Sequence, residues 1–158
     1  MRRNNRSVLL YLLFTVALVM TGGCNRKTIY HHYEHTPLAG WEKNDTLVYQ
    51  LPAAKERAVV QRDVELRVSA DYPFRSLHLI VEQIIYPSRH TRLDTLECEL
   101  VTPEGEMLGN GVSLYQYWFR LPDISLNEGD SLCIGIRHDM KREILPGIAD
   151  VGVRLTAY

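Results

Sequence analysis

The densest group of side chains able to bind a metal ion or move protons is the run His31-His32-Tyr33-Glu34-His35. Read as His-x-x-Glu-His, it matches a zinc-protease pattern in which a helix directs two imidazoles toward one metal. The run lies in a polar segment with no apolar helix face, and His78, His90 and His138 supply no evident third ligand. We therefore predict a solvated linker and no metal, with weak metal binding or contact with anionic lipid headgroups as alternatives.

Groups for nucleophilic or acid–base catalysis are dispersed along the chain. No Gly-x-Ser-x-Gly sequence marks a nucleophile elbow, and most carboxylates alternate with apolar residues, as on a solvated strand face. Asp94 and Asp150 differ, because each lies beside an apolar run near the end of an expected strand. We predict cap or turn hydrogen bonds for both, rather than acid–base work. The sequence thus favours a protein that is not an enzyme and has no cofactor.

Two cysteines, Cys98 and Cys133, lie within the expected folded part of the chain. Cys98 shares a strand face with Leu96 and Leu100, whereas Cys133 is out of phase with the apolar residues around it. Two small buried or half-buried thiols are the simpler interpretation. A disulfide between them is the alternative in an oxidising compartment.

A third cysteine, Cys24, ends a pattern typical of bacterial export. Basic residues at the start are followed by an apolar run, Val8 to Met20, and then by Thr21-Gly22-Gly23-Cys24. Thirteen residues at about 1.5 Å each span roughly 20 Å as a helix, less than the ~30 Å hydrocarbon core. We predict a lipoprotein signal peptide over residues 1–23 and acylation of Cys24, with an ordinary secretory signal as the alternative.

Charge and composition limit the classes of partner that the protein can bind. The signal segment carries three basic residues and no acidic one, so its removal leaves an acidic chain. No basic stripe suited to nucleic acid is present. We expect membrane attachment through the lipid, no nucleic-acid partner, and a polar tether over residues 24–44.

Beyond the tether, the pattern changes to short runs in which apolar and polar residues alternate or β-branched residues dominate. Turn signals such as Pro103-Glu104-Gly105 and Gly109-Asn110-Gly111 separate them. No amphipathic helix is convincing, although Met140–Gly147 is compatible with one helical turn. We predict an all-β antiparallel sandwich of seven to eight strands over residues 45–158. The expected strands are Thr46–Leu51, Asp63–Ala70, Leu77–Tyr86, Leu93–Val101, Val112–Leu121, Ser131–His138 and Asp150–Tyr158.

One expected strand is unusually aromatic. Tyr115, Tyr117 and Phe119 share one face and Trp118 takes the other, so both faces favour burial. Packing in the core is the commoner reason for such a strand. The alternatives are a surface for a protein partner and a platform for stacking sugars. The second alternative corresponds to a glycan-binding lipoprotein for surface nutrient uptake.

The order and spacing of these features resemble the gliding motility lipoprotein GldH family of the Bacteroidota. The resemblance spans nearly the whole mature chain, and its most specific piece is the final stretch 146–154. Other matching pieces are Tyr30 and Glu34, Trp41, Asp45-Thr46, Tyr72-Pro73, Asp94-Thr95-Leu96, Leu108-Gly109-Asn110-Gly111 and His138-Asp139-Met140-Lys141-Arg142.

The resemblance implies a cell-envelope lipoprotein tied to the assembly of gliding motility and type IX secretion machinery, with other envelope proteins as partners. It implies no catalytic residue, and it places the lipid on Cys24. Because Asn25-Arg26-Lys27 is not acidic, we favour the periplasm-facing leaflet of the outer membrane.

Overall fold

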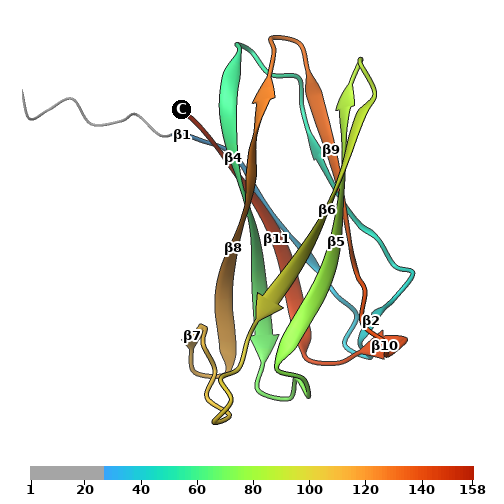
Figure 1. Cartoon of the computed structure of the whole chain (residues 1–158), viewed down its shortest axis with the longest axis vertical. Helices are drawn as coiled ribbons and strands as arrows, with labels where there is room; N and C mark the ends of the chain where they lie inside the picture. The colour runs from blue at the N-terminus through green and yellow to red at the C-terminus, as the bar shows by residue number, and fades with distance from the viewer. Residues whose placement is uncertain (1–26) are drawn as a thin grey trace, which may run out of the picture.

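The computed structural model describes residues 27–158, which form two antiparallel sheets packed face to face (Figure 1). This confirms the predicted all-β sandwich. One sheet has the order β1 (Lys27–His35), β11 (Ile148–Ala157), β4 (Ala58–Ser69), β8 (Leu114–Leu126) and β7 (Asn110–Gly111). The other has the order β3 (Leu47–Leu51), β9 (Ser131–His138), β5 (Ser76–Tyr86) and β6 (His90–Glu99). A small ribbon pairs β2 (Trp41–Glu42) with β10 (Ile144–Leu145).

The core lies between the sheets and follows the period-2 pattern of the sequence. In β5, Leu77, Leu79 and Val81 are fully buried and alternate with more exposed residues. In β9, Leu132 and Ile136 follow the same alternation. Successive side chains of a strand point to opposite faces, so each strand presents one apolar row to the opposite sheet.

The segment expected to be a tether contains a long strand instead. β1 pairs with β11 along its whole length, from Lys27 opposite Ala157 to His35 opposite Asp150. None of its residues is buried, and apolar and polar residues do not alternate along it. β1 is an edge strand of the five-stranded sheet, with a neighbour on one side only. Pairing with β11, rather than burial in the core, holds this strand in place.

The outer face of β4 is also not the wet face that alternation suggested. Val64, Leu66 and Val68 do point into the core, but Asp63 and Glu65 on the other face are also buried. Side chains of the flanking strands cover them, since β4 lies between β11 and β8. β4 ends at Ser69, one residue before the end expected from the sequence, and Ala70 is exposed.

The end of the sandwich near β2 and β10 is closed by loops. Residues 140–147, compatible with a helical turn, instead form a bend and the two residues of β10. Trp41 is fully buried there, and its indole Nε1 donates to the Asp45 carbonyl at 3.0 Å. Gly147 has a φ of +82°, and a Cβ on it would lie 2.7 Å from the backbone of Tyr72, so glycine fits this turn.

Both cysteines of the described region are free. Cys98 is buried on the inner face of β6, and burial raises the pKa of its thiol well above its usual range. Cys133 is half-buried on β9. The structure therefore agrees with two separate thiols and not with the disulfide alternative.

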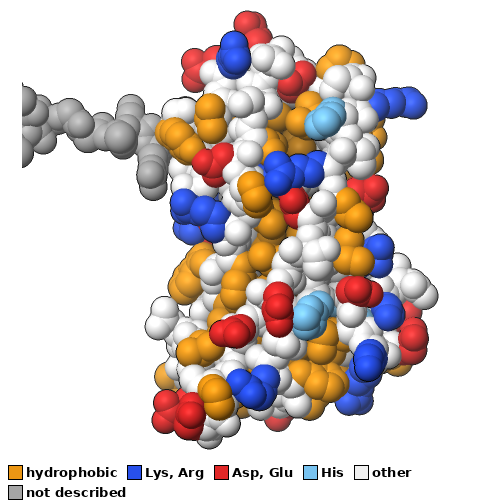
Figure 2. All heavy atoms as spheres, viewed as in Figure 1, with side chains coloured by type: hydrophobic (Ala, Val, Ile, Leu, Met, Phe, Trp, Pro, Cys, Tyr) orange, Lys and Arg blue, Asp and Glu red, His pale blue; other side chains and the backbone are white. Residues whose placement is uncertain are grey.

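The outer surface of the molecule is not uniformly polar where the edges of the two sheets meet. On the face seen in Figure 2, hydrophobic side chains gather along the line between the sheets, while acidic and basic side chains are spread around it. No helix within residues 27–158 is long and apolar enough to span a bilayer.

Candidate functional site

The aromatic strand is β8, and three of its four aromatic side chains belong to the interior. Tyr117 is 5% exposed and donates its hydroxyl hydrogen to the Leu100 carbonyl at 2.8 Å. Its ring stacks with Phe119 at a centroid distance of 6.2 Å and an interplanar angle of 7°. Tyr115 and Phe119 are partly buried against the core. The structure thus places these three in packing roles.

Trp118 points to the opposite face of the same strand and is 44% exposed. Leu114, four residues earlier on that face, is equally exposed, and Val112 lies beyond it in the turn between β7 and β8. We call Val112, Leu114 and Trp118 the β8 patch. Exposed tryptophan is enriched where proteins bind partners. Of the four aromatic residues predicted as a possible interaction surface, Trp118 is the exposed one.

Beside the β8 patch, the outer face of the sheet carries a row of residues in register across four strands. Each neighbour in the row is a paired position in the sheet. The row consists of Tyr33 on β1, Gly152 on β11, Glu65 on β4 and Trp118 on β8. The absence of a side chain at Gly152 lets the Tyr33 ring lie over the backbone, because a Cβ there would be 2.6 Å from the ring.

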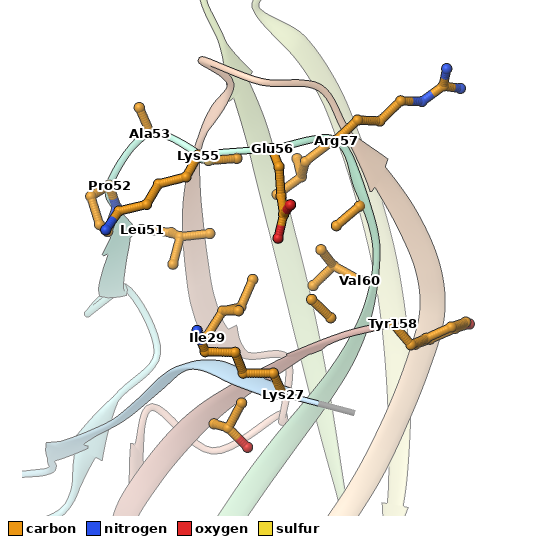
Figure 3. A pocket seen from close by; sticks show the side chains of 15 residues that line it. Lys27, Ile29, Leu51, Pro52, Ala53, Lys55, Glu56, Arg57, Val60 and Tyr158 are labelled. Carbon is orange, nitrogen blue, oxygen red and sulfur yellow. The ribbon is translucent and has the colours of Figure 1, made fainter. Parts of the chain in front are cut away.

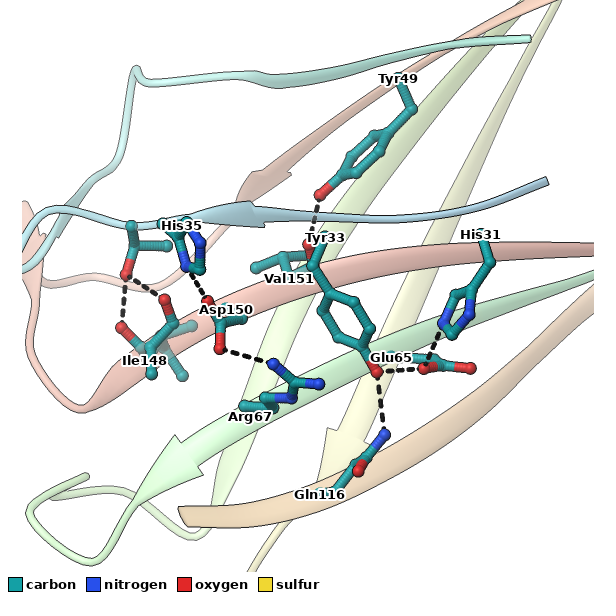
Figure 4. Close-up of polar contacts among 12 residues, drawn as sticks. His31, Tyr33, His35, Tyr49, Glu65, Arg67, Gln116, Ile148, Asp150 and Val151 are labelled. Atoms are coloured by element: carbon teal, nitrogen blue, oxygen red, sulfur yellow. Dashed lines mark hydrogen bonds and ion pairs between the residues drawn. The ribbon is translucent and has the colours of Figure 1, made fainter.

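Glu65 is the centre of this face and is only 1% exposed (Figure 4). The Tyr33 hydroxyl donates to its Oε2, and His31 Nε2 lies 3.1 Å from the same oxygen. Arg154 Nε is 3.1 Å from Oε1. Within residues 27–158 no hydrogen bond reaches Oε1, so the donors to Oε2 and the charge of Arg154 offset the cost of burying this carboxylate. Burial, together with the hydrogen bond to Glu65, raises the pKa of Tyr33 to about 12.

Tyr33 is itself held from two sides. The Arg67 guanidinium lies 4.2 Å from the centroid of its ring, an arrangement in which a cation faces the π system. The Gln116 amide on β8 donates to its hydroxyl at 2.9 Å. Tyr33 therefore ties the edge strand β1 to β4 and β8.

Two further carboxylates extend the network. Asp150 contacts His35 Nδ1 and lies 3.4 Å from Arg67 Nη1. Asp63 lies 3.3 Å from Arg120 Nε and 3.7 Å from Arg154 Nη2. Asp150 was expected to make a cap or turn bond and instead contacts His35 on β1 and Arg67 on β4. Each of these carboxylates has basic side chains beside it, so the face carries a network of ion pairs and hydrogen bonds.

The histidines singled out by the sequence are separated by the alternation of β1. His31 and His35 face the network, whereas His32 pairs with Glu34 at 3.0 Å. Within residues 27–158 no group of three or more His, Cys, Asp or Glu residues is arranged to hold a metal ion. His138 is fully buried, and its Nε2 lies 3.1 Å from the Trp41 carbonyl.

Asp94 was predicted to make a cap or turn hydrogen bond. It accepts one local bond, from Arg92 Nε at 3.0 Å, but its main contacts reach other strands. It points between the sheets, where its Oδ2 lies 3.4 Å from Nη2 of Arg62, a side chain only 1% exposed. The Gln83 amide also donates to Asp94 at 2.9 Å. Sequence reasoning missed this group, although Asp94 has the same parity as Leu96 and Cys98 on β6 and therefore shares their inner face.

Cys24, the predicted acylation site, lies outside the described residues. It precedes the first residue of β1 by three positions.

The sequence of this chain is similar to that of known lipoproteins. Residues 28–155 match the sequence profile of the family described as GldH lipoprotein. The chain is 30% identical to the gliding motility lipoprotein GldH of Flavobacterium johnsoniae, with 98% of each chain covered. It is 27% identical to the homologue of that lipoprotein from Christiangramia forsetii, with 95% of this chain and 96% of the other covered. Among solved structures, an aminopeptidase from a marine sediment archaeon aligns at a TM-score of only 0.40, with 11% identity over 85% of this chain and 33% of its own.

Proposed function

Because the chain belongs to the GldH lipoprotein family, we propose that it is a non-catalytic component of the cell envelope that helps assemble the gliding motility machinery, the type IX secretion machinery, or both. In this proposal the lipid holds the protein on a membrane and the sandwich binds another envelope protein. The exposed Trp118, set beside a rigid network of ion pairs, is the observation that carries the binding role.

The membrane attachment is proposed at Cys24, the cysteine that ends the signal pattern. One acyl chain gives only marginal binding, whereas two or more chains anchor a protein stably. Asn25-Arg26-Lys27 follows the cysteine without an acidic residue, which favours the periplasm-facing leaflet of the outer membrane. Intact-mass analysis of the native protein tests this step, since an unmodified amino end would contradict it.

The β8 patch is suited to a protein partner for a physical reason. Trp118 and Leu114 present apolar surface on a strand whose inner face is fixed in the core. The neighbouring carboxylates and guanidinium groups are already paired, so a partner would not need to reorganise them. Preorganised aromatic residues of this kind are frequent hot spots in interfaces.

The contacts of the buried carboxylates also support the proposal that the protein has no catalytic role. Glu65, Asp63 and Asp150 each direct their oxygens to neighbouring side chains, which is an arrangement that stabilises a sheet. A folded Glu65→Gln variant is therefore expected to retain its partner. Loss of binding by such a variant, with its fold intact, would point to a direct role for the carboxylate.

The main test is capture of partners from solubilised membranes after crosslinking, with Trp118→Ala and Leu93→Ala compared. Leu93 is exposed on β6 and is outside the β8 patch, so it is the matched control. We expect the wild type and Leu93→Ala to recover the same envelope proteins and Trp118→Ala to lose them. Equal recovery by all three would contradict the assigned surface.

A glycan array separates the sugar-binding alternative. Trp118 lies between Gln116 and Arg120 on one face of β8, and a ring among polar groups can also stack on a sugar. Glycan binding that disappears in Trp118→Ala would replace the assembly role with nutrient uptake. Strains lacking the gene, examined for both surface spreading and protein secretion, would then show which process depends on the protein.

A further inference from the structure

A cavity of about 630 Å³ opens at the end of the sandwich where β1 begins (Figure 3). It lies between the start of β1, the loop from β3 to β4, and the ends of β8 and β11. This volume falls within the roughly 300–1,000 Å³ typical of small-molecule sites. It is far from the β8 patch, whose Leu114 and Val112 lie near the opposite end of β8 (Figure 1).

The floor of the cavity is the core, and its walls combine apolar side chains with a few charged ones. Leu51, Val60 and Leu126 line it and are buried members of the core cluster. Figure 3 shows Ile29 and Val60 turned toward the same space. Four alanines leave this end of the sandwich underfilled, because their side chains are too short to meet across it. They are Ala53, Ala54, Ala58 and Ala157.

The rim carries more basic than acidic charge. Lys27, Lys55 and Arg57 line the cavity together with one acidic residue, Glu56. Figure 3 shows the Glu56 carboxylate turned toward the space and the Arg57 side chain turned away from it. An apolar floor with a mainly basic rim matches the chemistry of a lipid, whose acyl chain is apolar and whose membrane surroundings carry anionic headgroups. The Glu56 side chain lies on an exposed loop and would have to turn outward when a chain enters.

The lipid proposed on Cys24 would begin close to this cavity. Cys24 is three residues before Lys27, and three residues span at most about 11 Å even when fully extended. We propose that this end cavity receives one acyl chain of the lipid on Cys24 of the same molecule, an inference that rests on the lipidation proposed above. The remaining chains stay in the bilayer.

Docking of one chain would fix the orientation of the domain. The end with Lys27, Lys55 and Arg57 would lie against the headgroups, and the β8 patch would point away from the membrane toward a partner. Ile29, which is 39% exposed, would become covered by the chain. Covering the apolar surface of the cavity is the favourable contribution, because that surface is otherwise exposed to water while the chain is in an apolar environment both in the bilayer and in the cavity.

The test uses the full lipidated protein made in cells that are fed a fatty acid carrying a photoreactive diazirine. After illumination of membranes, the sites joined to the acyl chain are mapped by mass spectrometry. We expect crosslinks within residues 51–60 and at Leu126 or Ala157. In Ile29→Glu these crosslinks should fall about tenfold, the change that accompanies loss of about 1.4 kcal/mol of apolar burial.

Val48→Glu is the matched control, because Val48 is also an exposed β-branched residue near this part of the chain but does not line the cavity. It should crosslink like the wild type. A second variant, Ala54→Trp, fills the cavity without adding charge and should reduce the same crosslinks.

The outcomes separate the two proposals. Label on Cys24 with crosslinks only to bilayer lipids, or elsewhere on the domain, would overturn the docking and leave the lipidation intact. Absence of any label on the protein would overturn both.

Discussion

Tyr33 on the edge strand β1 donates its phenolic hydrogen to the buried carboxylate of Glu65 on β4, two strands away across the sheet. The ring passes over Gly152 of the intervening strand β11 to reach it. A residue that the sequence assigned to a tether is therefore part of the sheet's tertiary structure. The contact also explains how an edge strand with so little apolar surface is held.

Replacing Tyr33 with phenylalanine should lower the free energy of unfolding by about 1.5–3 kcal/mol, because a buried carboxylate loses a charge-assisted hydrogen bond. Tyr86→Phe on β5 is the control, since Tyr86 is exposed and outside this network. Urea denaturation of both variants measures the difference. A Tyr33→Phe variant as stable as the control would contradict the importance of the hydrogen bond.

Gly152→Ala should destabilise the protein by about 1–3 kcal/mol, the usual cost of overpacking. The added Cβ would lie 2.6 Å from the Tyr33 ring, so the ring would have to move away from Glu65. In a Tyr33→Ala background the same substitution should cost almost nothing, since the obstructing ring is gone. Additive effects in the two backgrounds would show that the ring is not the cause.

The ion pair between Arg62 and Asp94 supports a third prediction. Arg62 is buried between the sheets, and its burial lowers the pKa of its guanidinium while Asp94 opposes the shift. Asp94→Ala leaves this cation without its carboxylate and should cost about 3–5 kcal/mol. Thermal and denaturant unfolding should both report the loss.

Two comparisons sharpen this prediction. Arg92→Ala removes an exposed cation 3.0 Å from the same carboxylate and should cost less than about 1 kcal/mol. Arg62→Met combined with Asp94→Leu removes both charges and should recover most of the stability lost in Asp94→Ala. If the double variant were as unstable as the single one, an uncompensated buried charge would not be the reason.

The sequence predicts a strand well when one of its faces packs against the apolar core, and poorly when its contacts are polar. Alternation identified the inner faces of β6 and β9, because the core rewards one apolar row per strand. In β6, Cys98 shares a face with Leu96, and in β9, Cys133 is out of phase with its apolar neighbours. It could not identify β1, whose partners are charged and aromatic side chains on the outer face of the sheet. These contacts join residues more than 30 positions apart, such as His31 and Glu65.

In the candidate site, too, the apolar contacts were predictable from the sequence and most of the polar ones were not. The two faces of the aromatic strand were predicted from parity, and the structure assigns Tyr117 to the core and Trp118 to the surface. The buried position of Glu65 was not predictable, because a carboxylate alternating with valine and leucine has the same pattern whether water or arginine covers it. Asp94 was predictable from its parity with Leu96, and only the expectation that carboxylates face water concealed it.

His138 gives the last prediction, on pH. Its ring is fully buried, and burial lowers the pKa of its imidazole, against the opposing effect of the hydrogen bond to the Trp41 carbonyl. The neutral ring can donate from Nε2 to that carbonyl and accept at Nδ1 from the Met140 amide, 3.4 Å away. A second ring proton would place two donors against each other at Nδ1.

The direction of the pH effect on stability follows from which state binds the proton more readily. Below the ordinary histidine pKa of about 6.5, the unfolded chain takes up a proton that the folded chain resists, so stability falls as pH decreases. The contribution of one such group has a slope of at most about 1.4 kcal/mol per pH unit. Denaturation of the wild type and His138→Gln between pH 7.5 and 5, with the exposed His90→Gln as control, should show a shallower decline only in His138→Gln. Equal slopes in all three proteins would mean that His138 does not resist protonation.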